Sequence, residues 1–529
     1  MSGVDVIIRG ARIVDGSGGP AVDGDVGIAR GRLEVVGGRL SDGTGAAEVD
    51  ARGLVVAPGF IDLHTHSDVS LLSEPGCESA IEQGVTTQAV GLCGFSAAPV
   101  SSATVRAMVD EEPVFAFPGV AWDWTTIRGY RDAVTAARPA TNVTTFVGHN
   151  SLRRYVLGSA NRPPSGDELR TMQALVEQGI GEGARGFTTG LSYAPGLFAS
   201  VRELAALASV AAKHGLTYHT HMRYGDLSVR DSVDEALETA RRAGVTLNIS
   251  HLYPRPNRPP EEADVLLGKL DDARAGGLDV TFDLTVFPRG GGAWIQGLPG
   301  WARDGGNEAT AAIIRDPASR ARLKAELANP GPEAWATDWD DEVICKVNSP
   351  ANEGLFGRTI GEIARERGQE PVDTALDLVL EDGQFWVAPT IKDQRHLDRM
   401  IASPLCVPIG DGFSHHPVRH RAMGLMPKSF GTFPLVMGSY VRDRGVLSLE
   451  AAVHKATAEP ARRLGLADRG RLEGGLAADL VLFDPGTIAN RATEADPAAR
   501  PVGISRVMVD GRWVVVDGAA TGERPGRML

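Results

Sequence analysis

The feature that most constrains the fold is an alternation of short apolar strands and amphipathic helices that begins near residue 54. Between residues 201 and 282, a helical segment is followed directly by an apolar strand three times. These pairs are 201–214 with 217–219, 232–243 with 246–249, and 261–275 with 279–282. Alternation over about 250 residues predicts a parallel (β/α)8 barrel of the TIM type, in the α/β class, with its chemistry at the carboxyl ends of the strands.

Both ends of the chain carry a different pattern. Residues 4–56 consist of short strands and glycine-rich turns without a helical segment. Strand-like runs return at 479–483, 504–509 and 512–516. We expect these runs to pair with the N-terminal strands in one small β-sandwich domain. The predicted domains are therefore 1–57 and 466–529 for the β-sandwich, and 58–465 for the barrel.

The barrel pattern is interrupted at about 289–345, in a segment that opens with three consecutive glycines. A long insertion after a barrel strand is typical of a lid or a pocket wall. A packed surface subdomain is the alternative. A chain of 529 residues is also too long for one ordinary core, so several structural units are expected.

The composition limits the kinds of partner. A net charge of −13 and a pI of about 5.5 argue against nucleic acid and against an anionic membrane surface. The four cysteines lie far apart, which suits a reducing cytoplasm better than a disulfide framework. Neither a signal peptide nor an apolar stretch long enough to span a membrane is evident. We therefore expect a cytoplasmic protein with a small-molecule substrate, whose oligomeric state the sequence does not determine.

Metal-type ligands follow several predicted strands. The strand at 60–63 ends in His64 and His66, and a spacing of two residues places both side chains on one side of a strand. Imidazole is a common zinc ligand, although two structural histidines give the same pattern. Four further strand ends carry Cys93, His221, His251 and Asp411. Because a barrel brings its strand ends to one rim, we expect all of these side chains to lie together.

This set of residue types suits metal-assisted hydrolysis. A thiolate from Cys93 together with His221 and His251 makes a three-ligand zinc site that leaves one position open for water. Such a site activates water near neutral pH. Asp411 can accept the proton of that water and pass it to a leaving nitrogen, as general base and then general acid.

Eight ordered motifs carry a resemblance to a known family. They are PGFIDLHTH at 58–66, GLCGFS at 91–96, GHNSLR at 148–153, GARGFTTGL at 183–191, HMR at 221–223, ISH at 249–251, GTFP at 431–434 and AADLV at 477–481. Over nearly its whole length the chain resembles the zinc amidohydrolases, and specifically the D-aminoacylase (N-acyl-D-amino-acid deacylase) family.

The resemblance implies one tightly held zinc and a second, weaker metal position. The ligands that it assigns are Cys93, His221 and His251 for the first, and His64, His66 and Asp411 for the second, with Cys93 able to reach both. It also implies that Asp411 is the general base and acid, and that the insertion is a lid. The implied reaction is hydrolysis of the amide bond of an N-acyl amino acid or a related acylated amine.

Three positions that bind the substrate carboxylate in that family differ here. A lysine of the family is Tyr253, a tyrosine is Thr285, and an arginine is Lys428, whose ammonium is a point charge rather than a bidentate fork. These changes predict that simple N-acetyl-D-amino acids are poor substrates. His149 is a further candidate for substrate contact, with a structural role at the barrel rim as the alternative.

The segment 413–426 is a candidate anion site, with a solvated loop as the alternative. Its basic side chains are His415, His416, Arg419, His420 and Arg421.

Two other functions stay open at this point. The same metal site also suits a lyase, cyclase or retro-aldol reaction on a different carbonyl substrate, with the metal as a Lewis acid. The fold also occurs without activity as a binding scaffold, although a scaffold has no need of an open metal site.

Overall fold

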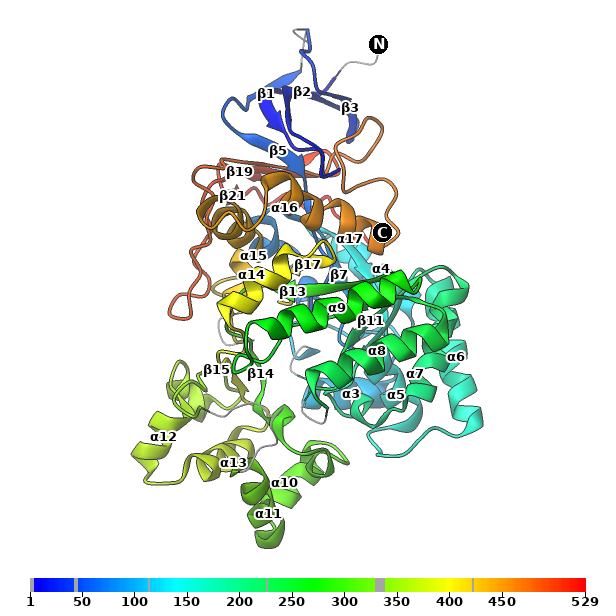
Figure 1. Ribbon diagram of the computed structural model, residues 1–529, viewed down its shortest axis with the longest axis vertical. Coiled ribbons are helices and arrows are strands. Elements are labelled where there is room, and N and C mark those ends of the chain that lie inside the picture. Colours follow the sequence, from blue (N-terminus) through cyan, green and yellow to red (C-terminus); the bar gives the residue numbers. More distant parts are fainter. Residues whose placement is uncertain (1–3, 42–45, 113–114, 225–226, 329–337, 421–422) are drawn as a thin grey trace.

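The computed structural model describes residues 4–41, 46–112, 115–224, 227–328, 338–420 and 423–529. Figure 1 shows three parts: a β-sheet region that contains strands from both ends of the chain, a barrel in the middle, and a smaller, mainly helical part that projects from the barrel. The predicted barrel and the predicted β domain from both ends of the chain are therefore present.

Eight strand positions form the barrel. They are β6 (Phe60–Asp62), β7 (Val85–Val90), β8 (Asn142–Thr145) with β9 (Val147–Gly148), β10 (Gly186–Gly190), β11 (Thr217–His221), β12 (Thr246–Ile249), β13 (Val280–Thr285) and β17 (Cys406–Ile409). All pairings within the two sheets, β6-β7-β8 and β9-β10-β11-β12-β13-β17, are parallel. Only Phe146 separates β8 from β9, so the two sheets are joined along one strand.

The ring closes between β6 and β17. The backbone N–H of Gly410 donates to both carboxylate oxygens of Asp62 at 3.1 Å, and the N–H of Asp411 donates to the carbonyl of His64 at 2.9 Å. A side chain at position 410 would place its Cβ 2.5 Å from Asp62 Oδ2, so glycine is required for this approach. The same contacts place the first and last strand ends next to each other.

Helices cover the outside of the barrel (Figure 1). Three that the sequence predicted are α7 (Val201–Lys213), α8 (Val229–Ala243) and α9 (Glu261–Ala275). Helix α8 begins three residues earlier than predicted because the side chain of Ser228 caps it by accepting the N–H of Asp231. Helix α8 buries an apolar face against β12, and it ends at Gly244, whose φ of 65° suits a glycine C-cap.

One nine-stranded sheet joins the two termini. Its strands are β1 (Val6–Ile13), β2 (Val22–Ala29), β3 (Arg32–Val36), β4 (Ala47–Asp50), β5 (Val55–Pro58), β18 (Leu480–Phe483), β19 (Ile504–Val509), β20 (Arg512–Val516) and β21 (Ala519–Ala520). The antiparallel pair of β5 with β18 connects the N-terminal strands to the C-terminal strands. Ile8 and Val26 share one buried cluster with Leu480 and Leu482. The predicted β domain is thus built from both termini, as one continuous sheet.

The insertion is longer than the predicted 289–345. Its strands are β14 (Gly292–Ala293), β15 (Ile344–Lys346) and β16 (Trp386–Val387), and its helices are α10 (Asn307–Arg315), α11 (Pro317–Ala328), α12 (Ile360–Arg367) and α13 (Pro371–Asp382). Strand β16 pairs with both β14 and β15, whereas β13 pairs directly with β17. Helices α12 and α13 have the amphipathic pattern of barrel helices, so the pattern alone does not assign them to the insertion.

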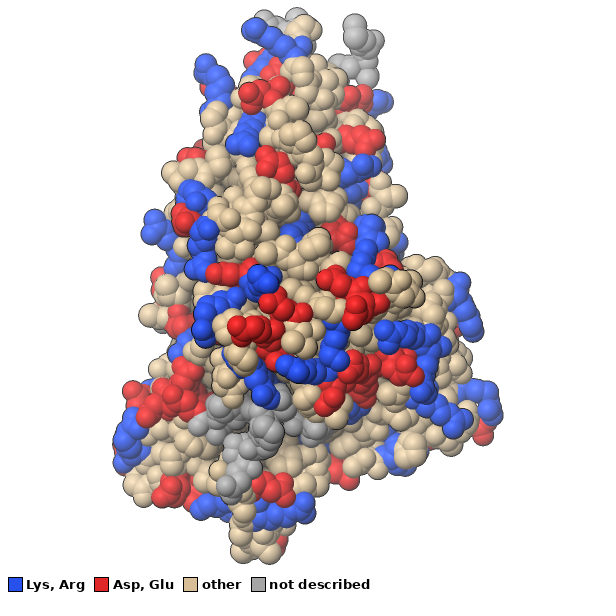
Figure 2. All heavy atoms as spheres, viewed as in Figure 1, with Lys and Arg blue, Asp and Glu red and all other residues tan. Residues whose placement is uncertain are grey.

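In the described part of the chain, no helix has the length and apolar character needed to cross a membrane. On the face drawn in Figure 2, basic and acidic side chains are interspersed and do not gather into one large area of either sign. The potential metal ligands gather instead inside the molecule, at the rim of the barrel.

Candidate metal centre

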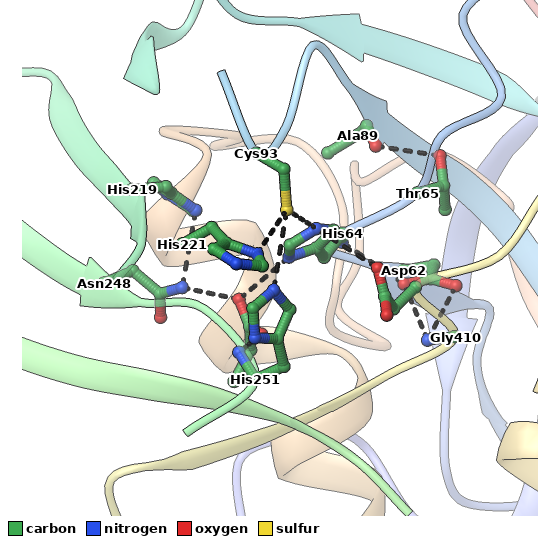
Figure 3. A network of polar contacts seen from close by, with 12 residues as sticks. Asp62, His64, Thr65, Ala89, Cys93, His219, His221, Asn248, His251 and Gly410 are labelled. Atoms are coloured by element: carbon green, nitrogen blue, oxygen red, sulfur yellow. Dashed lines mark hydrogen bonds and ion pairs between the residues drawn. The ribbon is translucent and has the colours of Figure 1, made fainter. Parts of the chain in front are cut away.

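The side chains that the sequence places at strand ends converge at the barrel rim. Figure 3 shows His64, Cys93, His221 and His251 directed toward one another. They form two overlapping groups: Cys93, His221 and His251 in the first, and His64, His66, Cys93 and Asp411 in the second. Within each group, the potential ligand atoms all lie within 4.8 Å of one another. The structure thus brings the predicted side chains together. Their role as metal ligands stays a prediction.

The first group has the spacing that a tetrahedral zinc requires. Cys93 Sγ lies 3.6 Å from His221 Nδ1 and 3.5 Å from His251 Nε2. Bonds of about 2.3 Å to sulfur and about 2.0–2.1 Å to nitrogen, at the tetrahedral angle, separate the two ligand atoms by about 3.6 Å. The three side chains thus offer donor atoms at the spacing of a tetrahedral zinc site.

The second group fits a metal in the same way. Asp411 Oδ1 lies 3.5 Å from His64 Nε2 and 3.2 Å from His66 Nε2, and Cys93 Sγ lies 3.2 Å from His64 Nε2. Nitrogen and oxygen ligands of one tetrahedral zinc are about 3.4 Å apart. Cys93 belongs to both groups, so its thiolate would be available as a ligand to a metal at either position.

Three of these side chains extend from strained backbone. Cys93, His251 and Asp411 have φ values of 51°, 36° and 47°, in the left-handed region that residues other than glycine rarely adopt. Such conformations cost on the order of 1–3 kcal/mol each and cluster at functional sites. The Cys93 turn is held by β10, where a Cβ at Gly190 would lie 2.0 Å from the Cys93 carbonyl oxygen.

Asp283 orients two of the histidines from behind. Its Oδ2 lies 3.4 Å from His64 Nδ1 and accepts the side-chain amide of Asn248 at 2.7 Å, while Oδ1 accepts the backbone N–H of His251 at 2.5 Å. This contact directs His64 Nε2 toward Cys93, as carboxylates behind metal-binding histidines commonly do. Sequence reasoning did not assign Asp283 this role, although an acid within the buried strand β13 was an available signal.

Electrostatics favour the anionic forms of Cys93 and Asp411. Burial opposes ionisation of the Cys93 thiol, but the surrounding imidazoles, His64 first, lower its pKa well below the usual value. Burial likewise opposes ionisation of Asp411, and Lys428, whose Nζ donates to Asp411 Oδ2 at 2.7 Å, lowers the carboxyl pKa well below its ordinary value. Thiolate and carboxylate are the forms that bind a metal.

A cavity of about 500 Å³ opens onto the two groups. Three residues predicted to contact substrate, Tyr253, Thr285 and Lys428, line it together with His66, His221, His251 and Asp411. Trp294 and Trp386 of the insertion form part of its wall. The insertion thus acts as a pocket wall, which is one of the two alternatives that the sequence left open.

Comparison with known proteins agrees with this geometry. The sequence pattern of the Amidohydrolase family matches residues 47–515. The chain belongs to the amidohydrolase family.

Three relatives place this amidohydrolase with the D-aminoacylases. The N-acyl-D-glutamate deacylase of Alcaligenes xylosoxydans xylosoxydans is 34% identical over 99% of this chain and 96% of the relative. The crystal structure of N-acyl-D-glutamate deacylase from Bordetella bronchiseptica, with zinc and a phosphonate mimic of the tetrahedral intermediate, is 30% identical, with a TM-score of 0.82 over 100% of both chains. The structure of a D-aminoacylase is 31% identical, with a TM-score of 0.83 over 99% of both chains. That enzyme has a binuclear metal centre, in which one metal activates and the second attenuates. The protein is thus an enzyme that hydrolyses amide bonds.

His149 lies outside the cavity wall of this amidohydrolase. It begins helix α5 (His149–Leu157), is fully buried, and places Nε2 2.9 Å from Glu203 Oε1. Glu203 also accepts two hydrogen bonds from Arg153, at 2.6 and 2.7 Å. These contacts favour the structural role of His149 over the predicted substrate contact. His149 belongs to a buried cluster with Glu203 and Arg153.

Where it is described, the segment 413–426 is partly buried and partly exposed: His415 and His420 are buried, whereas Val418 and Arg419 lie at the surface. Arg421 lies outside the described residues. His415 is fully buried against Phe117, Phe413 and Phe430, and burial lowers its pKa to about 3, so it is neutral. The guanidinium of Arg419 donates to Glu74. The predicted anion site finds no support in these contacts, because the imidazole is uncharged and the guanidinium is already paired.

Two further cavity residues were not predicted. Tyr193 lies three residues after β10, and its hydroxyl is 3.1 Å from His221 Nδ1. Its position after a strand end is the signal that identified the other site residues. Lys392 follows the insertion, far from any strand end that the sequence marked, so only the folded chain places it in the cavity wall.

Proposed function

We propose that this amidohydrolase is a zinc-dependent deacylase of N-acyl amino acids, of the N-acyl-D-amino-acid type. The observation that carries the proposal is the pair of ligand groups sharing Cys93, with the carboxylate of Asp411 directed into the same cavity. The names of the relatives, which are deacylases of N-acyl-D-amino acids, support the D configuration.

The first group is proposed as the tight zinc site and the second as a weaker one. Cys93, His221 and His251 offer donors at zinc spacing without Asp411, which is already paired with Lys428. The one-metal activation described for a related D-aminoacylase supports one working metal. When bound, the zinc acts as a Lewis acid and makes water a nucleophile near neutral pH.

The residues of the chain perform the proton transfers. Asp411 keeps Oδ2 on Lys428 and presents Oδ1 beside His64 and His66, where it can accept a proton from the attacking water. Asp411 then returns the proton to the nitrogen as the amide C–N bond breaks and the new C–O bond remains in the acid product. The hydroxyl of Tyr193 lines the cavity 3.1 Å from His221 Nδ1. We assign it as a donor to the substrate carbonyl oxygen, where negative charge develops.

The cavity supports a substrate larger than an N-acetyl amino acid. A volume of about 500 Å³ with aromatic walls from Trp294, Trp386 and Phe413 suits a long or aromatic group on the acyl or amino-acid side. We therefore keep the prediction that N-acetyl-D-methionine and N-acetyl-D-leucine are poor substrates. The free, buried thiols of Cys77, Cys345 and Cys406 are consistent with work in a reducing cytoplasm.

The test is a matched panel of N-acyl-D- and N-acyl-L-amino acids that differ in acyl length, assayed with zinc-replete enzyme in H₂¹⁸O. The proposal expects release of the amino acid, a preference for D isomers, and one ¹⁸O atom in the carboxylate product. Release of product without ¹⁸O would favour the lyase or cyclase alternative. Absence of turnover across the panel would contradict the deacylase proposal.

A further inference from the structure

Lys392 is a buried lysine in the wall of the catalytic cavity. Only 2% of the residue is exposed, and it lines the same cavity as His221, His251 and Asp411. Its backbone N–H donates to Pro288 O at 3.1 Å, and its Nζ donates to Phe287 O at 3.1 Å. Both carbonyls follow β13, so the end of a barrel strand fixes the position of the ammonium.

The ammonium lacks an anionic partner among the described residues. Its one described hydrogen bond, to Phe287 O, uses one of three N–H donors. The charges that act on it are Lys428, which repels it, and Asp411, whose Oδ2 already accepts from Lys428. Burying a charge is costly unless it is paired, so an anion bound in the cavity would stabilise the charged form of this lysine.

A series of aromatic rings connects this cation to the first ligand group. The Nζ of Lys392 lies 4.8 Å from the centroid of the Tyr253 ring. Tyr253 stacks on Tyr224 at 6.1 Å, and Tyr224 meets the His221 ring edge-on at 5.3 Å. The ammonium is therefore on the cavity side of the metal centre, one tyrosine pair away from a predicted ligand.

We infer that Lys392 binds the carboxylate of the substrate and thereby determines specificity for N-acyl amino acids over neutral amides. The inference rests on the proposed function. The sequence assigned this role to Lys428, but the 2.7 Å contact with Asp411 gives Lys428 a different task. A carboxylate beside Lys392 receives charge-assisted hydrogen bonds from the ammonium, while its amide bond extends toward Asp411 and the ligand groups.

A purely structural lysine is the competing explanation, and the chain offers examples for comparison. Lys455 is buried with its Nζ on the carbonyl oxygens of Ser403 and Cys406, and it does not line the cavity. Lys346 is buried in β15 of the insertion, with Nζ 5.5 Å from the centroid of the Trp386 ring, and it also does not line the cavity. Lys346 is therefore a matched control for the loss of a buried ammonium beside an aromatic ring.

The experiment compares an N-acyl amino acid with its C-terminal amide, the best pair from the substrate panel, in unmodified, Lys392→Met and Lys346→Met enzymes. The readout is the ratio of kcat/KM for the acid to that for the amide. We expect the ratio to fall by roughly 10²–10³-fold in Lys392→Met, the range for removing one partner of a buried charge pair. The ratio should stay within about threefold of the unmodified value in Lys346→Met. A parallel loss for acid and amide in Lys392→Met would overturn the inference.

A second measurement keeps the inference testable if Lys392→Met does not fold. The unmodified enzyme is inhibited with the free amino-acid product and with the corresponding amino-acid amide. We expect the acid to bind at least about tenfold more tightly, and equal inhibition would overturn the inference. Hydrolysis of N-acyl amino acids by the unmodified enzyme tests the proposed function separately, so a failure of one claim is distinguishable from a failure of the other.

Discussion

Lys428 Nζ lies 2.7 Å from Asp411 Oδ2, so the residue that the sequence assigned to the substrate carboxylate contacts the predicted catalytic carboxylate. The pair is largely buried, with side-chain exposures of 8% and 16%. It leaves Oδ1 of Asp411 directed at His64 and His66. One carboxylate thus belongs to a candidate ligand group and to the cavity wall at once.

Substitution of Cys93 by alanine removes the side chain that both ligand groups share. We expect loss of the tightly held zinc and of turnover, because only two of the three proposed protein ligands would remain. Cys406→Ala is the matched control, since Cys406 is equally buried in β17 but belongs to neither group. Zinc content after dialysis, measured by elemental analysis, checks the result; retention of one zinc by Cys93→Ala would refute the assignment.

Replacement of Asp411 by asparagine preserves shape and removes the proton acceptor. Turnover should fall by roughly 10²–10⁴-fold, the usual contribution of a general acid–base. Zinc on Cys93, His221 and His251 should remain, because Asp411 is not a member of that group. Steady-state kinetics together with zinc analysis separate the two effects, and near-normal turnover in Asp411→Asn would assign the proton transfer to another residue.

The sequence predicted the barrel and the convergence of the ligands for one physical reason. Parallel strands bring their carboxyl ends to a single rim, so residues as distant as His64 and Asp411 could be placed together from strand ends alone. The position of Lys392 and the role of His149 could not be derived in this way. The position of Lys392 depends on where the insertion returns to the barrel, and the role of His149 depends on its contact with Glu203 in α7.

The preference for carboxylate substrates should decline as pH rises through about 7. Burial, with repulsion from Lys428, lowers the pKa of Lys392 from 10.5 to about 7, so the side chain is cationic below that pH and neutral above it. The acid-to-amide ratio of kcat/KM cancels titrations that both substrates share. We expect this ratio to be level below about pH 6 and to fall toward pH 9; a level ratio in the unmodified enzyme would contradict this role of the charge.

Glu203→Gln should destabilise the fold without changing substrate preference. Arg153 is fully buried and keeps its charge, and removing one partner of a buried pair costs about 3–5 kcal/mol. Although burial opposes ionisation, His149 and Arg153 lower the pKa of Glu203 below 4.5. The stabilisation is therefore present above the unfolded pKa and is lost as pH falls through the folded value. Thermal unfolding at neutral and acid pH checks this, and an unchanged Tm near pH 7 would contradict it.

The central claim is that the working zinc is held by Cys93, His221 and His251. The most direct measurement is a crystal structure of active, zinc-replete enzyme with anomalous diffraction data collected on both sides of the zinc edge. We expect a strong zinc peak about 2.3 Å from Cys93 Sγ and about 2.0–2.1 Å from one nitrogen each of His221 and His251, with any second peak beside His64, His66 and Asp411 weaker. Active crystals without zinc at the first position, or with zinc only at the second, would contradict it.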